Sequence, residues 1–370
     1  MVNPFEPAKA ELVSTPSLVV DVPIVQANLK RLHDYANAHQ IHVRPHTKTH
    51  KSQLFARMQL DYGASGLTTA KVGEAEVMAQ ESSDILIAYP VVDPERCRRA
   101  AELAKHCTVR VALDSRQGID ALAEYARAIG STVGVLVDIN VGTNRTGVAS
   151  PRDALALAKR VEQQSPALRL DGIFFYPGHI WNPTQEQVNP LQAIDATLAS
   201  TIELWGTNGL AAPIVSGGST PTAYQSHWVR SQTEIRPGTY LFNDMNTARA
   251  GFCERSQCAA ALVCTVVSNA VPGKAVVDAG TKTLTSDRNV MHPESGHGHV
   301  IEYPEAKVVR LSEEHGEIDF KDCESIPRVG ERLTIIPNHI CPCMNLQQAV
   351  YLQSPEGLTT ASIDTRGMLT

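Results

Sequence analysis

Short runs of β-branched residues alternate with longer segments of helical spacing through the first two-thirds of the chain. In the longer segments apolar residues recur at three- and four-residue steps, which predicts amphipathic helices. The first turns of these segments are rich in Pro, Asp, Ser and Glu, as helix starts commonly are. The short runs predict buried strands at residues 17–22, 42–48, 66–70, 85–91, 109–114, 133–140, 172–177 and 213–218.

Eight such strand–helix repeats, within roughly 230 residues, are what a (β/α)8 barrel requires. The alternative is an open doubly wound sheet, which normally has fewer strands and a Gly-rich turn after the first one. The first predicted strand, residues 17–22, runs directly into Pro23 without such a turn. The pattern therefore favours the barrel.

The pattern changes after about residue 245, where helical spacing disappears. Segments rich in β-branched residues, some separated by Pro and Gly turn signals, predict strands there. They cover residues 260–271, 274–280, 299–304, 306–311, 331–337, 348–353 and 359–367. We expect an α/β protein: a TIM-like barrel over residues 15–245, then a C-terminal β domain over 246–370 that also takes residues 1–14.

Composition and charge exclude several classes of protein. Hydrophobic residues make up 43% of the 370, and the net charge is −6 with both signs spread along the chain. No basic block indicates a nucleic-acid surface, and no apolar run has the length of a membrane span. The N-terminus lacks a signal-peptide pattern, and the eight cysteines are scattered, mostly in apolar segments. We expect a cytoplasmic protein with most of its thiols reduced.

Candidate chemistry begins at the end of the second predicted strand, in the basic segment RPHTKTHK at 44–51. Barrel active sites lie at the carboxyl ends of strands, which is where Lys48 falls. Arg44 and Lys51, together with partial burial, would lower the pKa of Lys48 and make it an amine nucleophile. The alternative is a basic loop in solvent.

A phosphate loop is predicted at SGGSTPT, residues 216–222, after the eighth predicted strand. Gly218 lets the backbone approach an anion, and the hydroxyls of Ser219 and Thr220 add donors. Gly238 and Thr239, in the following segment EIRPGTY, could complete this cradle. A strand-to-helix turn with a Ser or Thr cap is the structural alternative.

Two more strand ends carry candidates. Arg145 follows the sixth predicted strand and could contact a cofactor ring, with Asp138 as its partner, although a structural ion pair explains both residues as well. Tyr176 ends the seventh predicted strand and could donate a hydrogen bond to a cofactor or only cap the barrel.

A metal pair is predicted in the β domain. His339 and Cys341 stand two apart in PNHICP and, on an extended strand, would point the same way. Imidazole with thiolate suits zinc. A competing cluster, His292, His297 and His299, lies in a Gly-, Ser- and Pro-containing segment that we expect to be a mobile loop.

Together these motifs resemble the D-serine dehydratase and D-threonine aldolase family, whose barrel is similar to that of alanine racemase. RPHTKTHK resembles the segment with the imine-forming lysine, which falls on Lys48. The motifs GGSTPT, RPGTY and VDINVGTNRTGV resemble the two phosphate-contacting segments and the segment with an arginine near the cofactor, and VVDAGTK, EEHG and PNHICP resemble features of the β domain.

This resemblance implies a lyase that uses pyridoxal 5'-phosphate and a divalent metal on His339 and Cys341, with zinc first and manganese as the alternative. It also implies a homodimer and a small β-hydroxy-D-amino acid as substrate. With Lys48 taking the α-proton, the products are a keto acid and ammonia. With a base such as His179 taking the hydroxyl proton, they are glycine and an aldehyde.

The motifs divide between these two reactions. Cys341 resembles the dehydratases, whereas Tyr176, Pro342, Asn345 and Leu346 resemble the aldolases, and the thiolate ligand favours elimination. Other classes stay open: an amino-acid racemase, a non-catalytic cofactor carrier, and a metal-dependent barrel hydrolase with ligands such as His46 and His50. The β domain argues against a carrier, since small carriers of this barrel type lack one.

Overall fold

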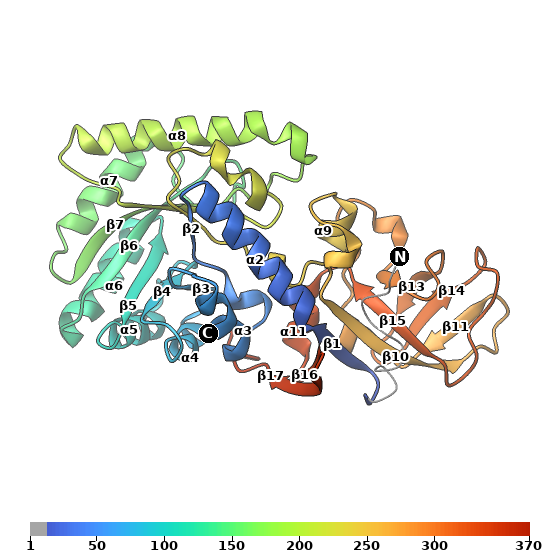
Figure 1. The fold of residues 1–370 in the computed structure, drawn as a ribbon. Helices are drawn as coiled ribbons and strands as arrows, with labels where there is room; N and C mark the ends of the chain where they lie inside the picture. Colours follow the sequence, from blue (N-terminus) through green and yellow to red (C-terminus); the bar gives the residue numbers. More distant parts are fainter. Residues whose placement is uncertain (1–12) are drawn as a thin grey trace. The chain divides into compact units, whose positions relative to one another are not determined.

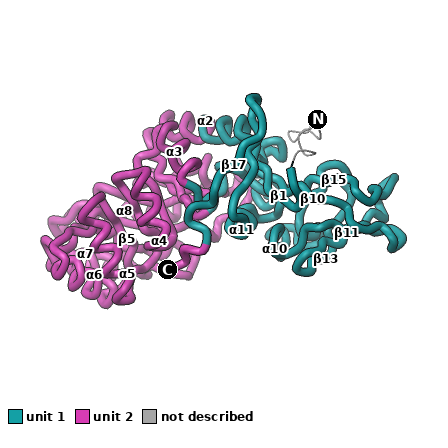
Figure 2. Tube along the Cα trace, turned by 90° about the horizontal axis from the view of Figure 1, so that it is seen from below, with its two compact units in different colours: residues 1–30, 49–52, 239–366 teal, residues 31–48, 53–238, 367–370 magenta. Residues whose placement is uncertain are grey.

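The computed structural model describes residues 13–370, which form two compact units (Figure 2). One unit contains the described residues up to 30 together with 49–52 and 239–366; the other contains 31–48, 53–238 and 367–370. Of the N-terminal segment 1–14 expected in the β domain, residues 1–12 lie outside the described part of the chain.

The second unit is built on eight parallel strands in the order β2-β9-β8-β7-β6-β5-β4-β3. A parallel bridge between His46 and Thr68 and a hydrogen bond from Ser65 N to Val43 O join β2 to β3 and close the sheet. The predicted barrel is thereby confirmed. Its strands are β2 (His42–Val43), β3 (Leu67–Thr69), β4 (Asp84–Ile87), β5 (Thr108–Leu113), β6 (Val133–Ile139), β7 (Leu168–Phe175), β8 (Ile214–Gly217) and β9 (Glu234–Ile235).

Helices on the outside of these strands follow the predicted spacing (Figure 1). Asp93, Ser115 and Ser150 accept hydrogen bonds from the backbone of their first helical turns, as N-caps do. The helices are α2 (Val22–Ala38), which crosses from one unit into the other, α3 (Gln53–Asp61), α4 (Val72–Met78), α5 (Pro94–Leu103), α6 (Arg116–Ile129), α7 (Pro151–Glu162) and α8 (Val188–Gly206). None of the described helices has the length and apolar character needed to cross a membrane.

Side chains of the barrel strands alternate between two cores. Leu86, Ala112, Leu136 and Phe174 form one cluster, while their neighbours along the same strands, such as Val111, pack with the helices in a larger one. Successive side chains of a strand point to opposite faces, so strands that are buried on both faces become continuous apolar runs.

One strand assignment is wrong. Residues 17–22, predicted as the first barrel strand, contain β1 (Ser17–Asp21), which pairs with β10 and β16 in the other unit. The missing barrel strand is Glu234–Ile235, which is too short to show a period. The loop at 216–222 therefore follows the seventh strand of the barrel and not the eighth.

The first unit contains a nine-stranded sheet, which confirms the predicted β domain. The prediction omitted β14 and the helices of this unit. The strands are β1, β10 (Ala260–Ser268), β11 (Lys274–Val277), β12 (Gly298–Val300), β13 (Lys307–Leu311), β14 (Gly316–Asp319), β15 (Arg332–Pro337), β16 (Ala349–Ser354) and β17 (Gly357–Ser362), with α9 (Met245–Arg249), α10 (Thr281–Leu284) and α11 (Ile340–Leu346).

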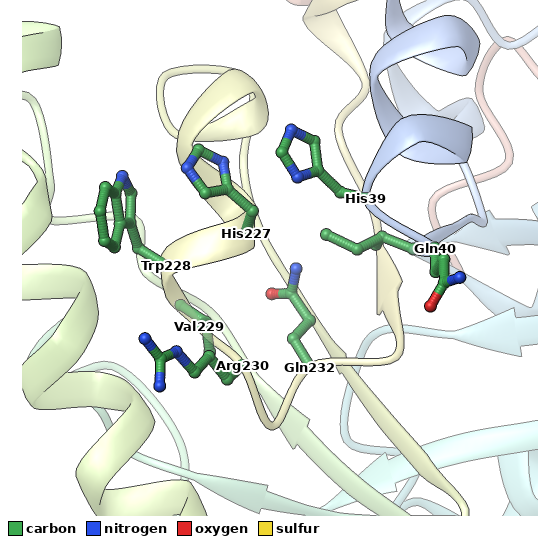
Figure 3. Close-up of a pocket in the computed structure, with 8 residues that line it drawn as sticks. His39, Gln40, His227, Trp228, Val229, Arg230 and Gln232 are labelled. Carbon is green, nitrogen blue, oxygen red and sulfur yellow. The ribbon is translucent and has the colours of Figure 1, made fainter.

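The amino end of the barrel carries a solvent-open pocket with about 880 Å³ of empty space (Figure 3). Gln40 and Ile41 line it just before β2, and Gln232 lines it just before β9. His227 and Trp228, from the short helix η3 (Ala223–Trp228), complete one wall.

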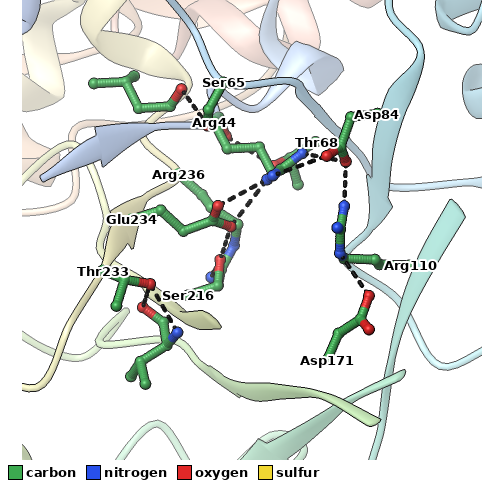
Figure 4. Close-up of polar contacts among 12 residues, drawn as sticks. Arg44, Ser65, Thr68, Asp84, Arg110, Asp171, Ser216, Thr233, Glu234 and Arg236 are labelled. Carbon is green, nitrogen blue, oxygen red and sulfur yellow. Dashed lines mark hydrogen bonds and ion pairs between the residues drawn. The ribbon is translucent and has the colours of Figure 1, made fainter. Parts of the chain in front are cut away.

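A chain of buried and half-buried charges crosses the barrel interior (Figure 4). Arg44 Nε lies 3.0 Å from both carboxylate oxygens of Glu234, and Arg44 Nη1 lies 2.6 Å from Asp84. Arg110 continues the chain from Asp84 to Asp171. Because Arg44 follows β2 and Glu234 belongs to β9, their ion pair ties together two strands that share only two residues of pairing.

Glu234→Leu should lower the free energy of unfolding by about 3 kcal/mol, because it leaves a buried guanidinium with one of its two carboxylates. Urea denaturation followed by circular dichroism measures this loss. Arg57→Ala, which breaks the exposed pair with Glu81, is the control and should leave the midpoint close to that of the wild type. Equal midpoints for both variants would contradict a structural role of the network.

Candidate active site

Lys48 is the exposed residue of an otherwise buried segment. It lies in the short helix η1 (Thr47–Thr49), and Thr47 and Thr49 are buried on either side of it. The neighbours expected to act on its amine are engaged elsewhere. Arg44 is neutralised by Glu234 and Asp84, and Lys51 Nζ lies 3.4 Å from the carbonyl of Thr365. The amine is therefore presented at a strand end without a carboxylate partner in the described chain.

The loop after β8 has the form of an anion cradle. Gly218 has a φ of +80°, which is strained for other residues, and a Cβ on Gly217 would overlap the ring of Phe175. The hydroxyls of Ser219 and Thr222 are buried and lie 3.0 Å apart. Close backbone approach and buried hydroxyls fit the phosphate of pyridoxal phosphate.

Arg236 adds a fully buried cation next to this loop. Its guanidinium donates to Ser216 Oγ at 2.7 Å and to Phe175 O at 2.8 Å, and it stacks 3.7 Å from the centre of the Phe174 ring. Burial lowers the pKa of Arg236 to about 10, against the opposing effect of Glu234. The sequence placed Arg236 only within the segment 234–240, because no local pattern shows that its side chain points into the barrel.

Arg145 and Tyr176 line one very small pocket together with Asp138. Arg145 stacks 4.9 Å from the centre of the Tyr176 ring, a cation–π contact that holds both side chains. No ion pair joins Arg145 to Asp138 in the described residues. Instead Asp138 is buried on β6, and burial raises its pKa to about 6, partly offset by a hydrogen bond from Thr146.

The orientation of His179 is set by Thr143. The Thr143 hydroxyl donates to Tyr176 O at 2.6 Å, so it can only accept from His179 Nδ1, which lies 3.3 Å away. The neutral ring then carries its proton on Nδ1 and a lone pair on Nε2. Burial lowers the pKa of His179, which favours this neutral form. A Cβ on Gly142 would lie 2.7 Å from Nε2, so this close approach requires glycine.

His339 and Cys341 lie together in the other unit, although not for the predicted reason. They do not share a strand: His339 is the N-cap of α11, and Cys341 lies in its first turn. Against burial, the hydrogen bond to Cys341 and nearby acidic charges raise the pKa of His339 to about 9. Against burial again, His339 lowers the pKa of the Cys341 thiol, aided by Thr49 and Thr239, whose hydroxyls lie 3.2 and 3.5 Å from Sγ. An imidazole beside a thiolate is a donor set that fits zinc.

Two carboxylates that sequence reasoning missed hold this pair. Asp287 Oδ2 lies 3.1 Å from His339 Nδ1, which leaves Nε2 as the nitrogen for a metal. The fully buried Asp244 accepts the backbone N–H of Ile340 at 3.1 Å and so fixes the start of α11. Asp287 is about 50 positions from His339 in the sequence and Asp244 is about 95, so no spacing pattern connects them with the pair.

Most of the predicted site residues lie at one end of the barrel. Lys48, Arg145, Tyr176, His179, Gly218, Ser219, Thr220 and Gly238 follow the carboxyl ends of β2, β6, β7, β8 and β9, which meet at one end of the barrel. Thr239 lies with the metal pair in the other unit.

The competing histidines do not gather into a site. His299 belongs to β12, not to the expected mobile loop, and accepts a bond from Arg255 Nη1 at 2.8 Å. His46 Nδ1 and His50 Nδ1 each accept a nearby backbone N–H. Among the described residues no group of three or more His, Cys, Asp or Glu could hold a metal. The ligand set that a barrel hydrolase would need is therefore missing from residues 13–370.

Two family models match the chain. The model of the alanine racemase N-terminal domain matches residues 20–246, and that of the serine dehydratase domain matches residues 259–353. The first of these covers the barrel and the second covers much of the nine-stranded sheet.

Individual relatives match over nearly the whole chain. The 3-hydroxy-D-aspartate aldolase of Paracoccus denitrificans is 31% identical over 90% of this chain and 87% of its own. The D-threo-3-hydroxyaspartate dehydratase of Delftia sp. is 30% identical over 89% and 91%. The crystal structure of D-threonine aldolase from Filomicrobium marinum matches with a TM-score of 0.89 and 30% identity, covering 97% of both chains.

Asp138→Asn should stabilise the protein at pH 7 but not at pH 4. Since the folded pKa of Asp138, about 6, exceeds the ordinary 3.8, the wild type loses stability as pH rises between these values. Asparagine keeps the acceptor for Thr146 without the buried charge. Urea midpoints of the variant and the wild type at both pH values measure the difference in stability. A difference of equal size at pH 4 and pH 7 would show that the charge on Asp138 does not destabilise the fold.

Proposed function

Because the chain belongs to the lyase family that includes D-serine dehydratase and D-threonine aldolase, we propose that it acts on β-hydroxy-D-amino acids, by β-elimination to a keto acid and ammonia. The observation that carries this proposal is the pair of His339 and Cys341 at the start of α11, with a thiol whose pKa is lowered. A thiolate donor resembles the dehydratase branch of the family.

Pyridoxal phosphate, when bound, supplies an electron sink for the electrons released at the substrate's α-carbon. Lys48 would hold it covalently through Nζ, and the loop at Gly218, Ser219 and Thr220 would bind its phosphate. Arg145 and Tyr176 are held against one another beside that end of the barrel and would orient the ring. Lys48 Nζ would then take the α-proton.

A divalent metal, when bound, neutralises charge that develops on the substrate's β-oxygen. His339 Nε2 and Cys341 Sγ would hold it, with zinc favoured by the thiolate. Support comes from two solved structures of D-threo-3-hydroxyaspartate dehydratase, one with a histidine and one with a cysteine replaced by alanine at positions two apart. The cysteine mutant is in the metal-free form.

The second candidate is retro-aldol cleavage to glycine and an aldehyde. It is favoured by His179, whose lone pair on Nε2 could accept the hydroxyl proton of a substrate. Two of the relatives named above are aldolases. The homodimer and the cytoplasmic location stay predictions of the sequence.

Product analysis distinguishes these reactions. Purified protein with pyridoxal phosphate and zinc should convert D-threonine to 2-oxobutyrate and ammonia, and 3-hydroxy-D-aspartate to oxaloacetate and ammonia, while L-threonine stays unchanged. Lys48→Ala should lose both the activity and the visible absorbance of the bound cofactor. Glycine with an aldehyde as products would contradict elimination and support retro-aldol cleavage. L-epimers as the only products would establish a racemase.

Asp287→Asn should weaken zinc binding by about 10- to 100-fold, because the amide that replaces the carboxylate has no charge to raise the basicity of the His339 ring. Competition with a chelating dye measures this affinity without reference to activity. Asp322→Asn, an exposed carboxylate of the same unit, serves as the control and should bind zinc like the wild type. Unchanged affinity in Asp287→Asn would refute this role of Asp287.

A further inference from the structure

We propose that the pocket at the amino end of the barrel binds a small carboxylate anion (Figure 3). Its lining comes from the residues before β2, from η3 and from the residues before β9. Lys48 and the loop at 218–222 follow the carboxyl ends of strands of the same sheet. The two sites therefore lie at opposite ends of the barrel, and a ligand here would not compete with substrate.

The first observation is a buried donor with no acceptor. Gln232 is 7% exposed, and its Nε2 has no hydrogen-bond partner among the described residues. Figure 3 shows its amide group turned toward the middle of the pocket-lining residues. An unsatisfied buried N–H costs about 1–3 kcal/mol. A rotation of the amide about its last side-chain bond would bring this N–H to the pocket surface, where an acceptor on a ligand would recover that cost.

The second observation is the tautomer of His227. Tyr35 Oη accepts the backbone N–H of His227 at 3.1 Å, and His227 Nδ1 is the only acceptor for its own proton among the described residues. Its own proton therefore goes to His227 Nδ1, 2.8 Å away. Burial and the neighbouring His39 lower the pKa of His227, so the ring is neutral at pH 7 and presents an N–H at Nε2.

The third observation is the balance of charge. Arg230 lines the pocket with an exposed guanidinium, and the lining residues include no Asp or Glu. The nearby Asp195 directs Oδ1 to the backbone N–H of Ser231 at 2.7 Å. One cation with neutral amide and imidazole donors matches a singly charged, planar oxyanion better than a phosphate, which carries more charge.

The remaining surface fits a short apolar body. Ile41 and Val229 are buried lining residues, and Trp228 packs 5.0 Å from His227, measured between ring centres. His227 in turn stacks on His39 at 4.4 Å. A small aliphatic or 2-oxo acid can therefore place its carboxylate on the donors and its carbon atoms against these side chains.

The test uses holoenzyme labelled with 5-fluorotryptophan and ¹⁹F NMR, since the chain has three tryptophans and Trp228→Phe identifies the signal in the pocket. The probes are butyrate and its uncharged analogue butyramide. Butyrate should shift the Trp228 signal saturably, with a Kd on the order of 1 mM, and leave Trp181 and Trp205 unchanged. Butyramide should produce no saturable shift. No shift with butyrate, or equal shifts with both probes, would overturn the proposal.

Variants test the donors. Gln232→Leu should weaken butyrate binding by about tenfold while keeping or raising thermal stability, because it removes the unpaired amide. Arg230→Gln, at an exposed position, should also weaken binding, and it decides the matter if Gln232→Leu folds poorly. Arg152→Gln, an exposed arginine on α7, is the matched control. Wild-type affinity in both pocket variants would overturn the assignment of these donors.

Discussion

The ion pair between Arg44 and Glu234 is the interaction on which the barrel depends. The strands that it joins, β2 and β9, pair over only two residues, and backbone hydrogen bonds extend this contact from His42 to His46. The ion pair adds a side-chain contact across the same part of the sheet. Glu234 also accepts from Ser216 Oγ at 2.6 Å, and Ser216 accepts from Arg236. The loop that carries Gly218 and Ser219 follows Ser216 directly. The same network that closes the barrel therefore fixes the start of the predicted phosphate loop.

The unit with the nine-stranded sheet solves a similar problem with different groups. Here Asp244 fixes the first turn of α11, and Asn338 Nδ2 donates to Gly296 O at 2.8 Å and to Asp287 O at 3.2 Å. The backbone on both sides of His339 is thereby held before any metal is present. A donor pair that is held in advance loses less conformational entropy when it binds.

The sequence was sufficient for the barrel, for the β domain and for the strand ends that carry Lys48 and Gly218. Repeats of apolar spacing over many residues carry that information. The errors fall where such repeats are absent. Ser17–Asp21 is an apolar run that would suit either sheet, and Glu234–Ile235 is too short to show a period.

Side chains that support a site from far along the chain also left no pattern in the sequence. Asp287 and Asp244 became visible only in three dimensions, and Arg44 looked like part of a basic loop although its charge is matched inside the barrel. His339 and Cys341 do lie together, but at the start of α11 and not on a strand, and their role as metal ligands stays a prediction. Residue types were therefore enough to propose candidate groups, whereas the residues that hold these groups in place became visible only in the structure.

The choice between elimination and retro-aldol cleavage depends on which group the structure holds better for action on the substrate's β-oxygen. Elimination requires that negative charge on a departing hydroxide be neutralised, and this is the task that we propose for a metal on His339 and Cys341. Retro-aldol cleavage requires a lone pair that accepts the hydroxyl proton, and Thr143 provides it by fixing the His179 tautomer. Both groups are present, but they differ in the number of contacts that hold them in place. His339, Thr49 and Thr239 lower the pKa of the Cys341 thiol against the burial that opposes its charge, whereas His179 is an exposed ring held by one hydroxyl. More groups therefore support the Cys341 thiol than support His179, and for that reason we propose elimination first.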